Sequence, residues 1–303
     1  MTCQYRRYDF DGSQKFNIGT KNSVCRFCGK SKPDVKFSNK AHALSEFLGN
    51  KQIICFEECN DCNDFFSKIE QQLFNFQSVL FPLFGIKGKS GTPKVKASDG
   101  EIYNENDIVK VKTEIRKEEC ITYDATGVGK LKVELSPFGA FIPQKVYQCL
   151  VKYAIGVINA EVLNQFNESI EWIRIENPPR QKLPPVIYFP HDFIEHPKIS
   201  VYLRAEDNNE FPFAIGCLEF ADKGFFYIIP LANSEPITID KIKNFIGLFA
   251  QQYGKKDVTL LNLSDTNEQK LVFNLDIDNV IPGQTMFEFS KEELDNTNEL
   301  PLT

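Results

Sequence analysis

The stretch VCRFCGKSKPDVKFSNKAHALSEFLGNKQIICFEECNDCNDFF, from Val24 to Phe66, decides the fold of the N-terminal part of this chain. It contains two CxxC pairs, Cys25 with Cys28 and Cys59 with Cys62, separated by thirty residues. Each short pair brings two sulfurs to one point, and a structural zinc ion takes four such ligands in a tetrahedron. The sequence therefore predicts a closed zinc site, which has no open position for catalysis.

Two other interpretations of these cysteines are buried free thiols and a dithiol redox pair, although a redox CxxC needs no distant second pair. Cys55 lies near the second pair and could replace Cys59 as a ligand, but the spacing favours Cys59 with Cys62. The chain has nine cysteines, so the zinc assignment leaves an odd number and a disulfide framework is not expected.

The first twenty residues lack the apolar core of a secretory signal, and no apolar run approaches the roughly 20 residues of a membrane span. Hydrophobic residues make up 42% of the chain and charged residues 25%, which is typical of a soluble globular protein. We therefore expect a cytoplasmic protein, in a reducing compartment, with no membrane partner.

Between the cysteine pairs the chain reads AHALSEFLGN from Ala41 to Asn50, and Asn63 directly follows the last cysteine. This order resembles the HNH endonuclease family. It is most similar to the four-cysteine branch, whose motif runs CxxC, then H-x-x-P-x-x-L-G, then C-x-x-C-N. The resemblance covers roughly the first quarter of the chain and says little about the remainder.

The resemblance implies a ββα-metal core of the treble-clef type and three catalytic roles. His42 matches the general base that takes a proton from the attacking water. Asn50 matches the central asparagine that orients this histidine, and Asn63 matches the helix residue that helps to hold a catalytic Mg²⁺ or Mn²⁺ on the phosphate. These roles are chemically reasonable, because phosphodiester hydrolysis needs an activated water and a cation near the phosphoryl oxygens.

Two positions depart from the family pattern. Ala41 stands where many members have an aspartate that ligates the metal, and Ser45 replaces the usual proline. A hard cation thereby loses its most natural oxygen ligand. Either the site is catalytically weak, with His42 a packed histidine or an additional zinc ligand, or another carboxylate replaces the missing one, the candidates being Glu46, Glu57, Glu58 and Asp64.

Charge is distributed unevenly along the chain. The net charge is −6, yet residues 1–97 contain fifteen Lys or Arg against nine Asp or Glu, so the remainder is strongly acidic. A basic N-terminal part fits a protein that meets a polyanion there. The segment from Gly85 to Lys96 lacks the spacing of a phosphate-binding P-loop. It is predicted to contact nucleic-acid phosphates or to act as a flexible linker, through four lysines: Lys87, Lys89, Lys94 and Lys96.

The predicted fold class is α+β, with two domains. Residues 1–97 form the zinc-bound HNH-like module, whose helix starts at Asn63. Residues 98–303 form an acidic mixed α/β domain of short strands and two or three helices. Predicted helices there are 145–159, 161–167 and 239–253. Strands are predicted at 186–189 and 199–203, with PHDFIEHP from Pro190 to Pro197 as a surface loop between them.

The function predicted from these observations is that of a metal-dependent endonuclease acting on nucleic acid, with DNA the expected substrate. The resemblance suggests a setting in bacterial or phage defence, with residues 98–303 recognising the target, a protein partner or a second copy of the chain. The alternative is a zinc-knuckle nucleic-acid-binding or interaction protein whose HNH core has lost cleavage. Ala41 is the residue that favours this alternative.

Overall fold

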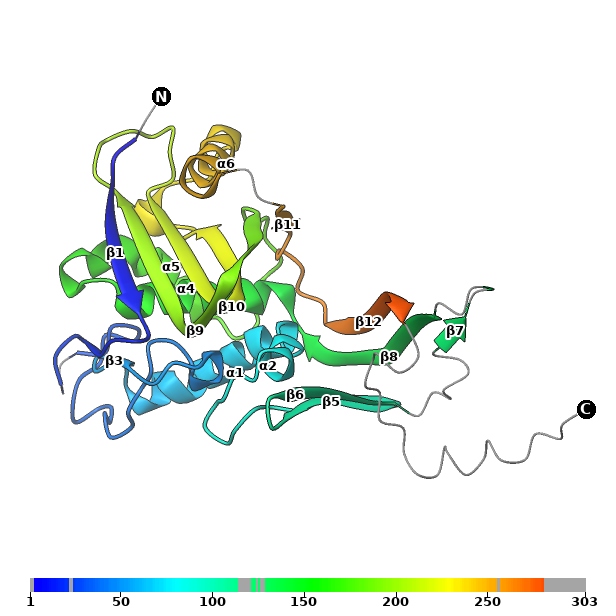
Figure 1. The fold of residues 1–303 in the computed structure, drawn as a ribbon. Coiled ribbons are helices and arrows are strands. Elements are labelled where there is room, and N and C mark those ends of the chain that lie inside the picture. The colour runs from blue at the N-terminus through cyan, green and yellow to red at the C-terminus, as the bar shows by residue number, and fades with distance from the viewer. Residues whose placement is uncertain are drawn as a thin grey trace, which may run out of the picture.

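The computed structural model describes residues 3–21, 24–113, 121–123, 125, 129–254 and 257–280. It is a mixed α/β protein, as predicted, in which runs of strands are separated by groups of helices (Figure 1). The elements in chain order are β1 (Tyr5–Asp11), β2 (Phe16–Ile18), η1 (Glu46–Leu48), β3 (Ile53–Cys55), α1 (Asn60–Phe76), α2 (Leu80–Leu83), β4 (Val95–Ala97), β5 (Gly100–Glu105), β6 (Ile108–Thr113), β7 (Ile121–Tyr123), β8 (Gly129–Phe141), α4 (Pro143–Val157), η2 (Ala160–Phe166), α5 (Asn167–Ile173), β9 (Val186–Arg204), β10 (Ala214–Ile228), η3 (Ala232–Ser234), α6 (Ile239–Tyr253), β11 (Thr259–Leu261) and β12 (Gln269–Val280).

The largest sheet has the strand order β1-β9-β10, and β11 also pairs with β9. All of these pairings are antiparallel. The first strand pairs along its whole length, from Tyr5 opposite Arg204 to Asp11 opposite Lys198. The N-terminal segment is therefore an edge strand of a sheet whose other strands come from the second half of the chain.

Helices cover both faces of this sheet. Successive side chains of a strand point to opposite faces, and the neighbouring residues Phe226 and Tyr227 of β10 contact different helices. Phe226 points to one face, where its ring stacks on Phe245 of α6 at 5.0 Å. Tyr227 points to the other face, where its hydroxyl donates to the carbonyl of Leu150 in α4 at 2.6 Å. Figure 1 shows α6 on one side of the sheet and α4 with α5 on the other. The sheet is thus the middle layer of this half of the molecule.

Strand β9 is much longer than the two short strands predicted from its sequence, at 186–189 and 199–203. Residues 190–197, predicted as a surface loop, continue the strand from Val186 to Arg204. The two prolines are accommodated because the register between β9 and β10 shifts on both sides of Ala221, which has a positive φ of 52°. Such bulges interrupt the ladder of hydrogen bonds, and a proline, which has no N–H to donate, is tolerated there.

Helices α1 and α4 form the centre of the larger hydrophobic core. The apolar residues Phe66, Ile69 and Leu73 recur every three or four positions in α1 and are all buried, which explains why this segment is helical. The predicted helices after residue 98 are also found, as α4, η2 and α6. Figure 1 shows α1 and α2 between the large sheet and the β5–β6 hairpin.

The core continues across position 97, where the sequence predicts a domain boundary. One cluster of buried side chains contains residues from α1 and from α4, β9 and β10. The guanidinium of Arg26 donates to the carbonyls of Ile155, at 2.8 Å, and Ile158, at 3.1 Å, at the end of α4. The division into residues 1–97 and 98–303 stays a prediction, and these contacts join the two parts closely.

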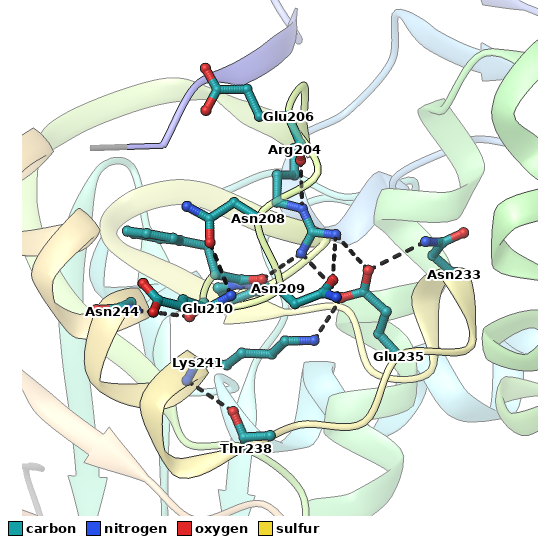
Figure 2. Close-up of polar contacts among 12 residues, drawn as sticks. Arg204, Glu206, Asn208, Asn209, Glu210, Asn233, Glu235, Thr238, Lys241 and Asn244 are labelled. Atoms are coloured by element: carbon teal, nitrogen blue, oxygen red, sulfur yellow. Dashed lines mark hydrogen bonds and ion pairs between the residues drawn. The ribbon is translucent and has the colours of Figure 1, made fainter. Parts of the chain in front are cut away.

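A buried polar cluster joins β9 to the start of α6 (Figure 2). The side chain of Glu235 accepts hydrogen bonds from Arg204, at 2.5 Å, and from Lys241, at 2.6 Å. Arg204 and Lys241 are only 3% and 4% exposed, and Glu235 is 15% exposed. Burial alone would raise the pKa of Glu235, but the hydrogen bonds from the two cations hold it below its ordinary value of 4.5.

Replacing Glu235 by glutamine is expected to lower the free energy of unfolding by about 3–5 kcal/mol, because it leaves two buried cations without a counter-charge. Since the pKa of Glu235 is lower in the folded protein, its contribution is complete above pH 4.5 and is lost as the pH falls through the folded-state value. Urea unfolding at pH 7 measures the change. Asp240→Asn is the control, because Asp240 pairs with Lys243 at an exposed position. Equal midpoints for the two variants would contradict the prediction.

Among the residues that the structure describes, no helix has both the length and the apolar surface that crossing a bilayer requires.

Candidate metal centre and the histidine beside it

The four cysteines of the two CxxC pairs lie together in the folded chain. Their sulfur atoms all lie within 4.8 Å of one another. The Sγ atoms of Cys28 and Cys59, one from each pair, are 3.8 Å apart. Four convergent sulfur donors form the ligand set of a structural zinc ion, so this cluster can hold one.

Local backbone structure brings each pair to this point. In the first pair, the N–H of Gly29 donates to the carbonyl of Cys25, at 2.8 Å, and the N–H of Cys25 donates to the carbonyl of Lys30, at 2.8 Å. Gly29 has a φ of +69°, which glycine adopts at little cost. In the second pair, Cys59 is the N-cap of α1 and Cys62 lies in its first turn. The partial positive charge at a helix N-terminus stabilises thiolates.

The proton affinities of these thiols show how closely they interact. A hydrogen bond from Cys62 lowers the pKa of Cys25 to about 4, and the same bond raises the pKa of Cys62 well above its ordinary value. Burial raises the pKa of Cys59 to about 11. Loss of the proton from Cys25 thus disfavours its loss from Cys62, and a bound Zn²⁺ would offset this repulsion between thiolates.

Cys55 is not part of the cluster, although it lies close in sequence. It is the last residue of β3, is 1% exposed and belongs to the main hydrophobic core. Burial raises the pKa of its thiol to about 12. A thiol of this kind is an inert core side chain rather than a metal ligand.

His42 lies on a short extended segment that pairs with β3. Its backbone forms an antiparallel bridge with Ile54, and the flanking residues Ala41 and Ala43 hydrogen-bond to β3 as well. The Nδ1 atom of His42 is 3.5 Å from a carboxylate oxygen of Glu46. Its Nε2 atom is buried and has no hydrogen-bond partner among the described residues. Burial lowers the pKa of His42, which favours the neutral imidazole that a general base needs.

Asn50 and Asn63 occupy different surroundings. The fully buried side chain of Asn50 donates to the carbonyls of Leu44 and Ile53 and accepts from the N–H groups of Gln52 and Ile53, so it closes the loop that follows His42. Asn63 is half-buried in the first turn of α1, beside Cys62. Within the described part of the chain, no hydrogen bond joins either asparagine to the His42 ring. Their catalytic roles stay predictions.

Only one of the four carboxylates considered as replacements for the missing aspartate lies against His42. Glu46 does so and is 37% exposed. Glu57 is hydrogen-bonded to Arg26 at 2.8 Å and to the N–H of Thr20 at 3.0 Å. The other two are Glu58, whose buried side chain pairs with Lys152, and Asp64, which is exposed on α1.

The structure also reveals a buried network that sequence reasoning missed. The ammonium group of Lys152, in α4, lies 2.7 Å from Glu70 of α1, 3.4 Å from Glu58 and 3.4 Å from the carbonyl oxygen of His42. The hydroxyl of Ser45 donates to Glu70 as well. Burial would lower the pKa of Lys152, but the two carboxylates raise it. No pattern in the sequence indicated this network, because at helical spacing Lys152 falls on the side of the predicted helix 145–159 opposite to its apolar face.

Lysines gather at two places on the N-terminal part. Those predicted to bind nucleic acid are all exposed, and Lys94 lies over the ring of Tyr103 at 4.5 Å. They are Lys87, Lys89, Lys94 and Lys96. A second group, Lys15, Lys21, Lys40 and Lys51, lines a hollow of about 550 Å³ beside the His42 segment.

No protein-family model, curated protein or solved structure matches this chain. The function is therefore inferred from the residues of this chain and their geometry.

Proposed function

We propose that this protein is a metal-dependent, HNH-like endonuclease that hydrolyses phosphodiester bonds of nucleic acid, with DNA as the expected substrate. The observation that carries the proposal is the pairing of His42 with Glu46 on a segment anchored to β3, in the same N-terminal part of the chain as a four-cysteine cluster that can fix the start of α1. In this proposal the cluster holds structural zinc and takes no part in the chemistry.

The chain's own residues would divide the reaction as follows. Neutral His42 accepts the proton of the attacking water, and its low pKa keeps it unprotonated near neutral pH. Glu46 supplies the carboxylate that the alanine at position 41 cannot, and Asn63 supplies an amide oxygen from α1. These oxygen donors suit Mg²⁺ or Mn²⁺, which when bound would neutralise charge that develops on the phosphate. Asn50 holds the loop between His42 and β3 in place.

The test is cleavage of supercoiled plasmid DNA by the purified protein, with Mg²⁺, with Mn²⁺ and in buffer without added divalent metal. We expect nicked and linear products only when the metal is added. Omitting the metal is preferable to adding a strong chelator, because a chelator would also remove structural zinc. Single-stranded DNA and RNA are tested in parallel. Intact nucleic acid under every condition, from protein that contains zinc and is folded, would contradict the proposal.

A second function is favoured by one specific observation. The Nδ1 atom of His42 faces Glu46, so Nε2 is the nitrogen that would accept the proton from water. This atom is buried, and the neighbouring Ala41 is only 2% exposed, so water does not reach Nε2 in this conformation. A zinc-knuckle module that binds nucleic acid without cutting it would have these features. Salt-dependent binding without cleavage in the plasmid experiment would select this function.

A further inference from the structure

The hollow beside the His42 segment has walls that the metal centre helps to fix. One wall is β2, which pairs in parallel with β3 so that Asn17 lies opposite Ile54. Another is the loop of residues 37–40. Asn60, the first residue of α1, accepts hydrogen bonds from the N–H groups of Ser38 and Asn39, both at 3.1 Å, and donates to the Ser38 hydroxyl at 2.7 Å. Asn60 lies between the two cysteines that begin the helix, so the cluster and the hollow share one support.

The charge of the hollow is positive and uncompensated. Lys15, Lys21, Lys40 and Lys51 are all exposed, and the lining found in the described part of the chain includes no carboxylate. None of these four ammonium groups is in an ion pair with a described residue. A surface with this local excess attracts a polyanion, and lysines contact phosphate groups as point charges.

The remaining lining is suited to a base rather than to phosphate alone. Phe37 and Phe56 are half-buried in the wall, and the ammonium group of Lys21 lies 5.1 Å from the centre of the Phe56 ring. Three exposed amide side chains, Asn17, Asn39 and Gln52, offer both donors and acceptors. Aromatic faces within a basic groove are how proteins bind single strands, since every base can stack on them. The volume of about 550 Å³ lies within the roughly 300–1,000 Å³ range of small-ligand sites.

We propose that this hollow binds an unpaired nucleotide of a single-stranded or locally unpaired nucleic acid, with the four lysines on flanking phosphates and Phe37 or Phe56 against the base. Paired bases stay stacked inside a duplex and cannot enter a hollow of this kind. Lys40 precedes His42 by two residues, and Ile54, which lines the hollow, is the bridge partner of His42. The strand would therefore pass beside His42. Only this last placement rests on the proposed endonuclease function; the binding does not.

Fluorescence anisotropy with labelled oligo(dT) and with a duplex of equal length tests the inference, using the His42→Ala background so that nothing is cut. The hollow variant carries four Lys→Gln changes, at Lys15, Lys21, Lys40 and Lys51. We expect weaker binding to oligo(dT) and a salt dependence shallower by about 0.7 for each phosphate that no longer meets a lysine. The control variant removes four exposed lysines from other surfaces, at Lys68, Lys112, Lys132 and Lys243, and should bind within about twofold of the parent.

Phe56→Leu tests the base contact separately, because leucine keeps most of the volume but lacks an aromatic face. Loss of one stacked base weakens binding by roughly 5- to 150-fold, and we expect this for oligo(dT) and not for the duplex. Circular dichroism and zinc content confirm that each variant is folded. If Phe56→Leu binds oligo(dT) as tightly as its parent, the same measurement is made on Phe37→Leu. Unchanged binding in both variants would overturn the base contact.

Unchanged oligo(dT) binding in the hollow variant would overturn the inference, and so would equal affinity of the parent for duplex and single strand. A third contrary result would be a loss of oligo(dT) affinity on Lys→Gln changes at the other group of lysines, Lys87, Lys89, Lys94 and Lys96, in place of the hollow. The outcome is independent of cleavage. A protein that binds oligo(dT) through the hollow but never cuts plasmid would support this inference and refute the proposed nuclease. A protein that cuts plasmid but whose oligo(dT) binding is unchanged in the hollow variant would support the nuclease and refute this inference.

Discussion

Cys62→Ser is expected to unfold the N-terminal module and to destabilise the sheet beyond it. Structural zinc in small peptides supplies roughly 10–16 kcal/mol of apparent binding free energy, which is also folding free energy. Serine is a poor zinc ligand, so most of this contribution would disappear. Cys62 lies in the first turn of α1, and α1 packs on α4 through the buried Lys152–Glu70 ion pair. The damage should therefore extend past residue 97 rather than stay within the first module.

Zinc content and urea unfolding measure this effect. The parent should contain one zinc per chain, and the variant should lose both the metal and a cooperative unfolding transition. Cys55→Ala is the matched control, because Cys55 is also buried and lies only seven positions before Cys62 but is outside the sulfur cluster. It should keep its zinc. A Cys62→Ser protein with full zinc and an unchanged midpoint would falsify the assignment, and zinc loss in Cys55→Ala would place Cys55 among the ligands.

His42→Ala is expected to reduce phosphodiester cleavage by about 10²- to 10⁴-fold, the usual contribution of a general base. The fold should survive, because the Nε2 atom makes no hydrogen bond to any described residue and the backbone bridge to Ile54 does not depend on the side chain. Initial rates of plasmid nicking, with zinc content and circular dichroism as controls for folding, measure the change. An unchanged rate would remove His42 from the mechanism.

The pH dependence of cleavage gives a second readout of the same residue. Burial lowers the pKa of His42 below its ordinary value of 6.5. A general base acts only when unprotonated, so the rate should rise with pH below 6.5 and become level above it. The residual activity of His42→Ala should lack this rise. A rate that still increases tenfold for each pH unit between 7 and 8 would assign the base to a different group.

The parts of the fold that the sequence predicted well are those set by nearby residues. The CxxC spacing is a local constraint, and it identified the four cysteines that the structure brings together. The helical period of Phe66, Ile69 and Leu73 likewise predicted α1. In contrast, the length of β9 depends on bulges opposite residues 190–197, which have no clear signal in the strand's own sequence.

The candidate site was less predictable because it is assembled from distant parts of the chain. Lys152 reaches the carbonyl of His42 across 110 positions, and no spacing rule connects them. The lysines of the hollow are also scattered, since β2 and β3 bring Lys15 and Lys51 to one place only after the strands pair. The net charge of residues 1–97 indicated a basic N-terminal part but not which lysines would converge.

The pairing of β1 with β9 has a consequence for synthesis on the ribosome. Roughly 190 residues separate β1 from the end of its partner strand, which at about 5–20 residues per second is a wait of roughly 10–40 s. During that time the nascent β1 is an unpaired strand, and its charged residues Arg6, Arg7, Asp9 and Asp11 discourage pairing with other chains. All four cysteines of the cluster emerge early in the same interval, so zinc can load before the sheet exists.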